Sequence, residues 1–257
     1  MASTITKTTP GIAAVEGTGP NRVLVLPGWA LDATVWLATR AKLDVTDFTF
    51  AYVDFPGYGV GRDEPLAEGI DGMAAVAIAA ADSLGWNRFG LLGHSMGGET
   101  ALRVASLVPE RVTTVVAVTP VSPAGTPLDA DTYASFNAAW ADPGAAISGA
   151  LSPRMAPADL ARLVARNRSS MSQATWEKYL HNWTSSPSFI DEIGRYGGKV
   201  TVLWGETDPF VTPAYLGDTL EALSNATLVE IPSAGHYPMI ENPGALAQII
   251  EKEFRGA

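Results

Sequence analysis

The sequence predicts an α/β protein with a mostly parallel central sheet, helices on both faces of the sheet and an inserted helical cap. Short β-branched runs alternate with amphipathic stretches along most of the chain, which is typical of strand–helix–strand units on a parallel sheet. This rhythm stops between residues 121 and 190, where the patterns become helical and Pro, Ser and Ala are frequent. With 257 residues, the chain is long enough to bury a large core in one such domain.

Six apolar runs are expected to form the strands, at residues 22–26, 48–55, 88–92, 112–118, 200–204 and 227–231. Helices are expected at residues 73–84, 100–108 and 214–223, with a last helix that begins at residue 243. We therefore divide the chain into a core, formed by residues 1–120 and 191–257, and a helical cap formed by residues 121–190.

The composition excludes several classes of protein. The chain has no cysteine, which rules out a thiol nucleophile, a disulfide scaffold and a cysteine metal site, and its three histidines argue against a multi-histidine metal centre. A net charge of −10 disfavours nucleic acid or an anionic membrane as a partner. No run reaches the roughly 18 apolar residues that cross a bilayer, and residues 1–10 lack the apolar stretch of a signal peptide. We expect a cytoplasmic protein that uses no metal and no cofactor.

The segment Gly93-His94-Ser95-Met96-Gly97 matches the pattern Gly-x-Ser-x-Gly. It follows an apolar strand and precedes a helical pattern, so it predicts a sharp strand-to-helix turn in which the flanking glycines avoid side-chain clashes. Such a turn exposes the serine hydroxyl at the positive end of the following helix. Ser95 is therefore the candidate nucleophile; the alternative is a plain glycine-rich turn.

A serine hydroxyl needs a base that accepts its proton. His236 lies in a loop after a predicted strand and before the last helix. His94 is adjacent to Ser95 and would point the wrong way, and His181 falls in the predicted cap. His236 is thus the candidate general base.

The base in turn needs a carboxylate that fixes its tautomer and stabilises its protonated form. Asp208 lies at the carboxyl end of a predicted strand, before His236 in the chain, and gives the order Ser, Asp, His. Glu206 is the nearest competing acid. Asp54, at the end of the second predicted strand, either braces the loop below the serine turn or caps an ordinary turn.

The oxyanion that develops on an attacked carbonyl needs backbone N–H donors. One expected donor is the amide of Met96, which follows the candidate nucleophile. The second should come from the loop after the first strong strand, where Gly28 allows the turn and the amide of Trp29 is preferred over that of Ala30. The ring of Trp29 can serve simple packing, because the assignment concerns its backbone alone.

Together these motifs resemble the α/β-hydrolase superfamily. The resemblance rests on Leu-Pro-Gly-Trp at residues 26–29, Asp-Phe-Pro-Gly-Tyr-Gly at 54–59, the serine turn, Gly-Glu-Thr-Asp at 205–208 and Ala-Gly-His at 234–236. It spans nearly the whole chain outside the cap, and it implies the α/β-hydrolase fold and a serine hydrolase. Residues 28–36 are similar to the pimeloyl-carrier-protein methyl ester esterases, and the chain also resembles lactone and meta-cleavage hydrolases. Two departures are Pro27, where the family usually has His, and Val60, where a hydroxyl residue is common.

The cap is expected to select the substrate. Trp176, Tyr179 and Trp183 are spaced along one face of a predicted helix, and Trp140 adds apolar bulk. Most of these side chains would by default pack the cap on the core. We expect some of the four to face the pocket, which favours an apolar ester or lactone as the substrate.

Four arginines make one stretch of the cap basic: Arg154, Arg162, Arg166 and Arg168. The esterase resemblance implies that such a cluster docks an acidic carrier protein, but a solvated helix face is the preferred interpretation. The expected partner is a small-molecule ester or lactone.

The expected reaction is hydrolysis of a carboxylic ester through an acyl-enzyme, with lactone hydrolysis as a close variant. The same three residues could instead cleave the C–C bond of a vinylogous diketone or act in a perhydrolase, as the resemblance also suggests. A non-catalytic ligand receptor is disfavoured by the complete set of Ser95, Asp208 and His236. Dehalogenases and epoxide hydrolases are disfavoured because they have Asp in place of the nucleophilic serine.

Overall fold

A seven-stranded sheet with the order β1-β3-β2-β4-β5-β6-β7 lies at the centre of the computed structural model, which describes residues 11–256. The strands are β1 (Ile12–Gly17), β2 (Asn21–Leu26), β3 (Phe48–Val53), β4 (Phe89–His94), β5 (Val112–Val118), β6 (Lys199–Gly205) and β7 (Ala226–Ile231). β1 pairs antiparallel with β3, and all other neighbouring strands are parallel. The predicted α/β architecture with a mostly parallel sheet is confirmed.

The six predicted strands are present, and five of them are largely buried, whereas β7 at the edge of the sheet buries only Ile231. Every residue of β4 is buried, as expected of a central strand in a parallel sheet. The additional strand, β1, lies at the edge of the sheet, and most of its residues are partly exposed. Its short side chains give little hydrophobic signal, so the sequence alone did not predict it.

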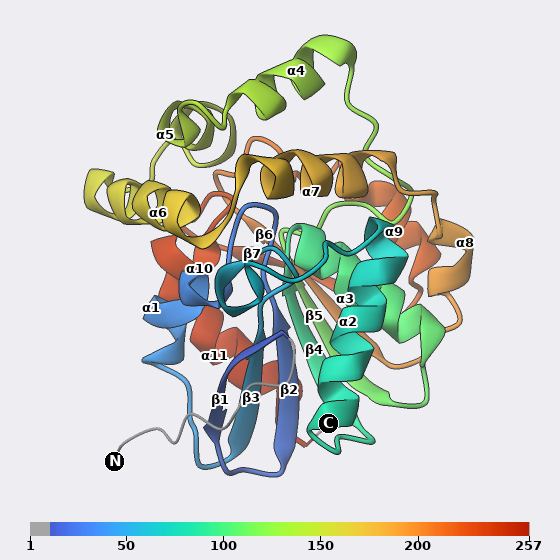
Figure 1. Cartoon of the computed structure of the whole chain (residues 1–257). Coiled ribbons are helices and arrows are strands. Elements are labelled where there is room, and N and C mark those ends of the chain that lie inside the picture. Colours follow the sequence, from blue (N-terminus) through green and yellow to red (C-terminus); the bar gives the residue numbers. More distant parts are fainter. Residues whose placement is uncertain (1–10, 257) are drawn as a thin grey trace.

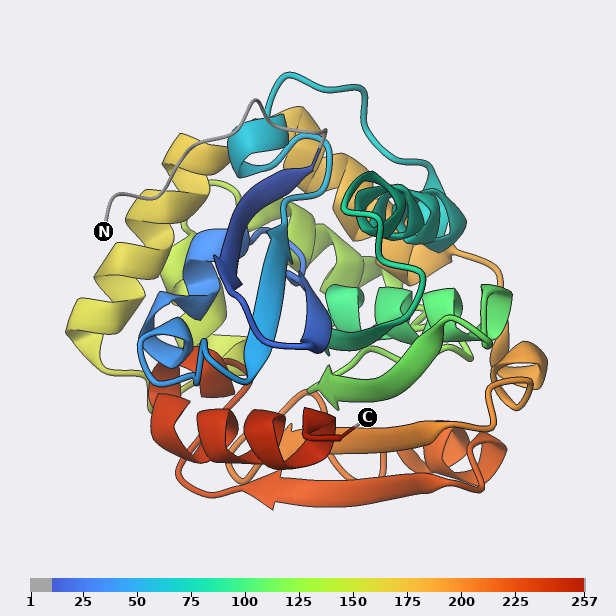
Figure 2. The ribbon, with the colours of Figure 1, turned by 90° about the horizontal axis from the view of Figure 1, so that it is seen from below.

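Helices cover both faces of the sheet, as Figure 2 shows from below. The helices that flank the sheet and its loops are η1 (Ala33–Trp36), α1 (Leu37–Arg40), η2 (Gly59–Gly61), α2 (Gly69–Ser83), α3 (Met96–Leu107), α9 (Gly217–Ala222), α10 (Pro238–Glu241) and α11 (Pro243–Phe254). α2 and α3 pack together on one face, and α1 and α11 pack together on the other. Both α2 and α3 begin four residues before their predicted start. The sequence did not indicate these first turns because each contains two glycines, which have low helix propensity.

The segment between β5 and β6 is helical and, in the part of the chain that the structure describes, contains no strand. Its helices are α4 (Ala130–Ala138), α5 (Pro143–Ala146), the π-helix η3 (Ile147–Leu151), α6 (Pro157–Ser170), α7 (Gln173–Ser185) and α8 (Ile190–Ile193). We refer to α4, α5, η3, α6 and α7 as the cap helices, because Figure 1 shows them over the carboxyl ends of the parallel strands. α8 instead packs beside α3 and α9. The division of the chain at residues 120 and 190 stays a prediction.

Side-chain hydrogen bonds tie the cap helix α7 to loops of the sheet. The hydroxyl of Tyr179 donates to the carbonyl of Pro56 at 2.6 Å, and the amide of Asn182 donates to the carbonyl of Ala67 at 2.9 Å. On the other side of α7, the indole N–H of Trp29 donates to the carbonyl of Trp176 at 3.0 Å. The first two bonds satisfy loop carbonyls and the third joins the predicted oxyanion loop to α7, so together they fix α7 above the carboxyl edge of the sheet.

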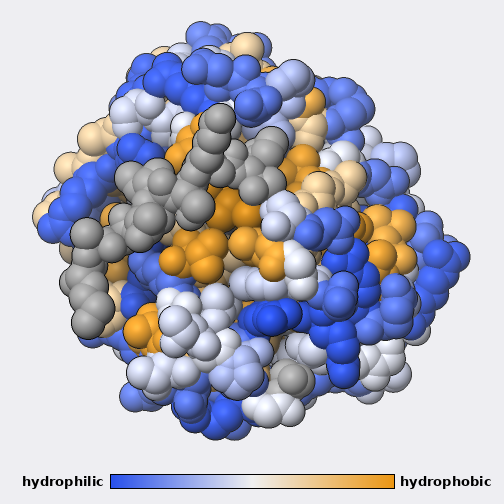
Figure 3. All heavy atoms as spheres, turned by 60° about the horizontal axis from the view of Figure 1, so that its bottom comes forward, coloured by the Kyte–Doolittle hydropathy of each residue, from blue (hydrophilic) through white to orange (hydrophobic). Residues whose placement is uncertain are grey.

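The lower side of the molecule carries both polar and apolar residues. Figure 3 shows hydrophilic residues around much of the lower side, with apolar residues gathered nearer its middle. Within residues 11–256, no helix combines the length and the hydropathy that a bilayer crossing requires.

Candidate active site

The candidate site lies where the strand order reverses. β2 and β4 are neighbours in the sheet, although β3 separates them in the chain. The loops that follow these two strands therefore diverge to opposite sides at the carboxyl edge and leave a crevice, which is where ligands bind in open α/β sheets. The serine turn follows β4, and the predicted oxyanion loop follows β2.

Ser95 occupies a strained turn between β4 and α3. Its backbone has φ 52° and ψ −118°, a left-handed conformation that favours glycine. The turn is tight: a Cβ atom at Gly93 would overlap the carbonyl of Gly97, and one at Gly97 would overlap the carbonyl of Pro27. Only glycine fits at these two flanking positions, so the sequence pattern has a direct steric reason.

The structure brings Ser95, His236 and Asp208 together in one buried line. His236 Nε2 lies 3.1 Å from Ser95 Oγ, and His236 Nδ1 lies 2.8 Å from Asp208 Oδ2. The second carboxylate oxygen of Asp208 accepts hydrogen bonds from the amides of Phe210 and Val211, at 2.9 and 3.0 Å. The carboxylate is thus anchored, holds the imidazole with Nδ1 protonated, and leaves Nε2 able to accept the serine proton.

The other candidate acid and histidines have different positions. Glu206 accepts a hydrogen bond from the amide of Ser233 at 2.7 Å and is not bonded to His236. His181 is exposed on α7. The structure therefore gives the contact with the imidazole to Asp208 rather than to Glu206.

His94 is buried and supports the backbone of the candidate base. Its Nε2 donates to the carbonyl of His236 at 2.7 Å, and the hydroxyl of Thr119 donates to the same carbonyl at 3.2 Å. Burial, together with the nearby His236, holds the pKa of His94 well below its usual range, so this ring stays neutral. His94 thus points away from the serine, as expected, but contacts the loop that carries the base.

The amide of His236 is held by Ser152 of the cap, which Glu241 of α10 holds in turn; the sequence singled out neither residue. It donates to the hydroxyl of Ser152 at 2.9 Å, and that hydroxyl donates to Glu241 at 3.0 Å. The same oxygen of Glu241 accepts from the amides of Gly235 and Tyr237, both at 3.0 Å. Glu241 follows His236 by one short helical turn of α10, and this spacing is the only sequence signal that could have indicated its role.

Two amides suit the predicted oxyanion hole. Met96 is the first residue of α3, where a helix has no acceptor of its own for the N–H group. The amide of Ala30 is already used, because it donates to the hydroxyl of Tyr58 at 2.9 Å. The amide of Trp29 makes no hydrogen bond to another described residue, so the geometry favours it over Ala30.

Asp54 braces the oxyanion loop and also closes the turn that follows β3. One carboxyl oxygen accepts from the amide of Ala33 at 2.6 Å, and the other accepts from the amide of Val60 at 2.9 Å. Burial raises the pKa of Asp54 to about 6, against the lowering effect of these two hydrogen bonds. Both sequence interpretations of Asp54 therefore describe part of its contacts.

A cavity of about 20 Å³ lies at Ser95 and His236, and a second cavity of the same size adjoins it. Trp183 lines the first cavity and Trp176 the second. Tyr179 and Trp140 line neither, because Tyr179 is buried against the loop at Pro56 and Trp140 packs between Trp176 and an arginine.

Aromatic side chains from the core complete the wall at Ser95. They are Trp29, Phe210 and Tyr237, with Phe136 from the cap. The sequence analysis did not identify Phe210 as a wall of the site. Its position two residues after Asp208 could have indicated this. Fixed rings on several sides make the site apolar around a single polar line of three side chains.

Comparison with known proteins shows the family of the chain. A family model described as "Alpha/beta hydrolase family" matches residues 23–249. A curated pimeloyl-[acyl-carrier protein] methyl ester esterase from Nitrosomonas europaea is 32% identical over 242 residues, which cover 88% of this chain and 92% of the relative. The chain belongs to the alpha/beta hydrolase family. It is an enzyme, a hydrolase of the esterase type.

Solved structures share the fold. An esterase from Thermogutta terrifontis superposes with a TM-score of 0.80 at 21% identity and covers 93% of this chain and 90% of its own. An enol-lactonase from Burkholderia xenovorans has a TM-score of 0.81 at 18% identity, with coverage of 93% and 94%. At these identities the likeness concerns the fold.

Proposed function

We propose that this protein hydrolyses a carboxylic ester through an acyl-enzyme, with Ser95 as nucleophile, His236 as general base and Asp208 as the residue that orients the base. The observation that carries the proposal is the unbroken line of hydrogen bonds from Asp208 Oδ2 through His236 to Ser95 Oγ. The strained turn at Ser95 and the unbonded amide of Trp29 support it.

In the first half of the reaction, Ser95 Oγ attacks the ester carbonyl while its proton moves to His236 Nε2. The carbonyl oxygen becomes an oxyanion and accepts hydrogen bonds from the amides of Met96 and Trp29. His236 then gives the proton to the departing alcohol, and the acyl group remains on Ser95.

In the second half, water attacks the acyl-enzyme. His236 accepts a proton from this water and returns it to Ser95 Oγ when the carboxylic acid leaves. Asp208 stays ionised throughout and stabilises the imidazolium in both halves.

The substrate that fits this site is a small to medium, largely apolar ester or lactone. Aromatic rings surround Ser95, so the groups next to the scissile bond should be uncharged. The similarity to a pimeloyl-[acyl-carrier protein] methyl ester esterase supports an ester, and the same machinery would open a lactone. Trp183 lines this cavity, and its buried indole N–H has no partner among the described residues.

The proposal is tested with a fluorophosphonate label and a panel of p-nitrophenyl esters, lactones and vinylogous diketones. The wild-type chain should be labelled and should hydrolyse esters, whereas Ser95→Ala should keep its fold, escape the label and lose about 10⁴-fold or more in kcat. Full labelling of the variant would refute the role of Ser95. Turnover of diketones without turnover of esters would refute the proposed substrate class.

A further inference from the structure

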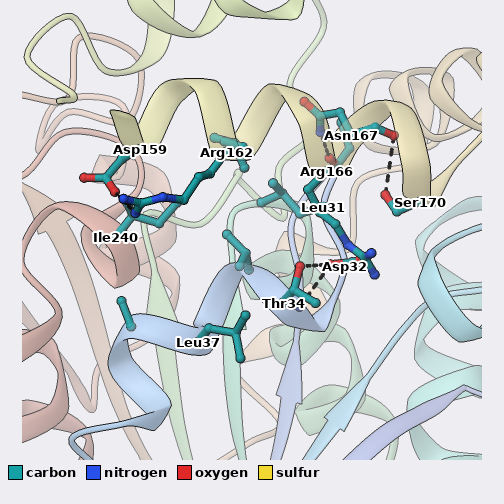
Figure 4. A pocket seen from close by; sticks show the side chains of 14 residues that line it. Leu31, Asp32, Thr34, Leu37, Asp159, Arg162, Arg166, Asn167, Ser170 and Ile240 are labelled. Carbon is teal, nitrogen blue, oxygen red and sulfur yellow. Dashed lines mark hydrogen bonds and ion pairs between the residues drawn. The ribbon is translucent and has the colours of Figure 1, made fainter. Parts of the chain in front are cut away.

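A groove of about 660 Å³ runs along the cap helix α6, outside the cavity at Ser95 (Figure 4). Its second wall is formed by η1 and α1, and α10 closes one end. The floor and walls include Leu31, Val35, Leu163 and Ile240, and Leu37 is 55% exposed at the edge. A hollow of this size that combines apolar side chains with a few polar groups is typical of a ligand site.

The groove adjoins the cavities that lead to Ser95. It shares Ala30, Leu31 and Asn167 with the inner cavity next to Trp176. That inner cavity in turn shares Trp29 and Phe136 with the cavity at Ser95. The three hollows are therefore neighbours between the surface and the candidate nucleophile, and the two inner ones are narrow, at about 20 Å³ each.

The neck between the groove and the inner cavity is Asn167. Its amide nitrogen donates to the carbonyl of Ala30, whereas its amide oxygen is buried and has no partner among the described residues. The side chain is thus held by its amide nitrogen alone, and turning it away would open the neck.

The charged groups of the groove cancel one another. Arg166 pairs with Asp32 at 2.5 Å, and Arg162 pairs with Asp159 at 2.7 Å. Two arginines and two aspartates leave no net charge, so the groove offers no excess of positive charge to an anionic group or an acidic protein. Its apolar floor instead matches an uncharged hydrocarbon chain.

We propose that the groove binds the long, uncharged apolar arm of the ester substrate, which passes Asn167 and Ala30 to reach Ser95. This inference rests on the proposed ester hydrolysis and extends its substrate class: the groups next to the scissile bond are small to medium, and one aliphatic substituent continues from them into the groove. Short esters do not reach the groove and leave it empty.

The test uses the absence of cysteine from the chain, which makes one introduced thiol unique. Ala38 is exposed and lines the groove, so Ala38→Cys followed by benzyl methanethiosulfonate fills the groove with a bulky group that dithiothreitol removes. Ala41, exposed one turn further along and outside the groove lining, supplies the matched control Ala41→Cys. Two substrate series are measured before and after labelling: p-nitrophenyl esters from acetate to palmitate, and acetates of alcohols from ethyl to hexadecyl.

Labelled Ala38→Cys should lose about tenfold or more in kcat/KM on the long members of one series, and dithiothreitol should restore it. Turnover of ethyl acetate and p-nitrophenyl acetate should stay within about twofold of the unlabelled variant, and labelled Ala41→Cys should change neither. The series that loses activity identifies whether the acyl or the alcohol substituent occupies the groove.

An equal loss on short and long esters, or no loss on any, would overturn the assignment of the groove while ester hydrolysis itself stands. A wild-type chain that hydrolyses no ester of either series would instead refute the proposed function, and with it the groove as a site for the arm of an ester.

Discussion

The loops of the core and the cap helices line the same cavity at Ser95, but they are fixed in different ways. In the core loops, the polar atoms of His236 and Asp208 all have partners: His236 through Asp208, Ser95, His94 and Ser152, and Asp208 through two backbone amides. In the cap, the indole N–H of Trp183 is buried without a partner among the described residues. The difference teaches that the proposed catalytic side chains are held in place before substrate arrives, whereas groups around them are not all paired: Trp183 Nε1 in the cap and His94 Nδ1 in the core are both buried without a partner among the described residues.

The largest effect should come from the acid that anchors the base. Asp208→Asn should lower kcat by about 10⁴-fold, because an amide favours the wrong tautomer of His236 and cannot stabilise its charged form. The matched variant Glu206→Gln should stay within a few-fold of wild type, since Glu206 bonds only to the backbone at Ser233. Steady-state rates on one p-nitrophenyl ester give both numbers, and the reverse ranking would assign the orienting role to Glu206.

A smaller loss should follow when the anchor of the His236 loop is weakened. Glu241→Gln replaces a carboxylate that accepts three hydrogen bonds at one oxygen, so the imidazole should be placed less accurately. We expect kcat to fall about tenfold to a hundredfold with KM nearly unchanged. Glu230→Gln, on the exposed side of β7, is the control. A fall in melting temperature with full kcat would mean that Glu241 only stabilises the fold.

The cap itself can be divided into residues that contact the substrate and residues that hold the cap. Trp183→Ala should change the preference among acyl groups by about 1–3 kcal/mol, because this ring lines the cavity at Ser95. Tyr179→Phe should leave the preference unchanged and lower the free energy of unfolding by about 1 kcal/mol, through loss of the bond to Pro56. Ester panels and thermal melts measure both. If Tyr179→Phe alters selectivity and Trp183→Ala does not, the assignment of the two residues is reversed.

The smallest effect should come from a buried carboxyl group beneath the serine turn. Glu99 is 1% exposed, and burial raises its pKa well above the ordinary value of 4.5. The folded chain therefore holds this proton more tightly than the unfolded chain, and the stability that the group contributes below pH 4.5 is lost as pH rises toward the folded pKa.

Glu99→Gln cannot titrate, so its melting temperature should fall less than that of wild type between pH 5 and pH 8. A difference of about 2–4 °C would correspond to 1 kcal/mol in a chain of this size. Glu221→Gln, exposed on α9, should follow wild type. Parallel curves for Glu99→Gln and wild type would show that the carboxyl group is not protonated in the folded chain.

The sequence alone indicated Ser95, Asp208 and His236, because each of them follows a predicted strand. The glycines around Ser95 are required by the turn itself, and Asp208 and His236 each follow an apolar run. Parallel strands bring all their carboxyl ends to one edge, so three separate local signals were enough to predict one site.

Tertiary structure decided what depends on contacts between distant segments. Trp176, Tyr179 and Trp183 share a helical spacing, but one faces the inner cavity, one packs on the loop at Pro56 and one lines the cavity at Ser95. Periodicity identifies the buried face of a helix, and not which neighbour each position meets. The support of His236 by Ser152 and Glu241 is likewise invisible in the sequence, since a buried amide N–H can donate to any nearby acceptor oxygen and only the folded chain determines which oxygen is near.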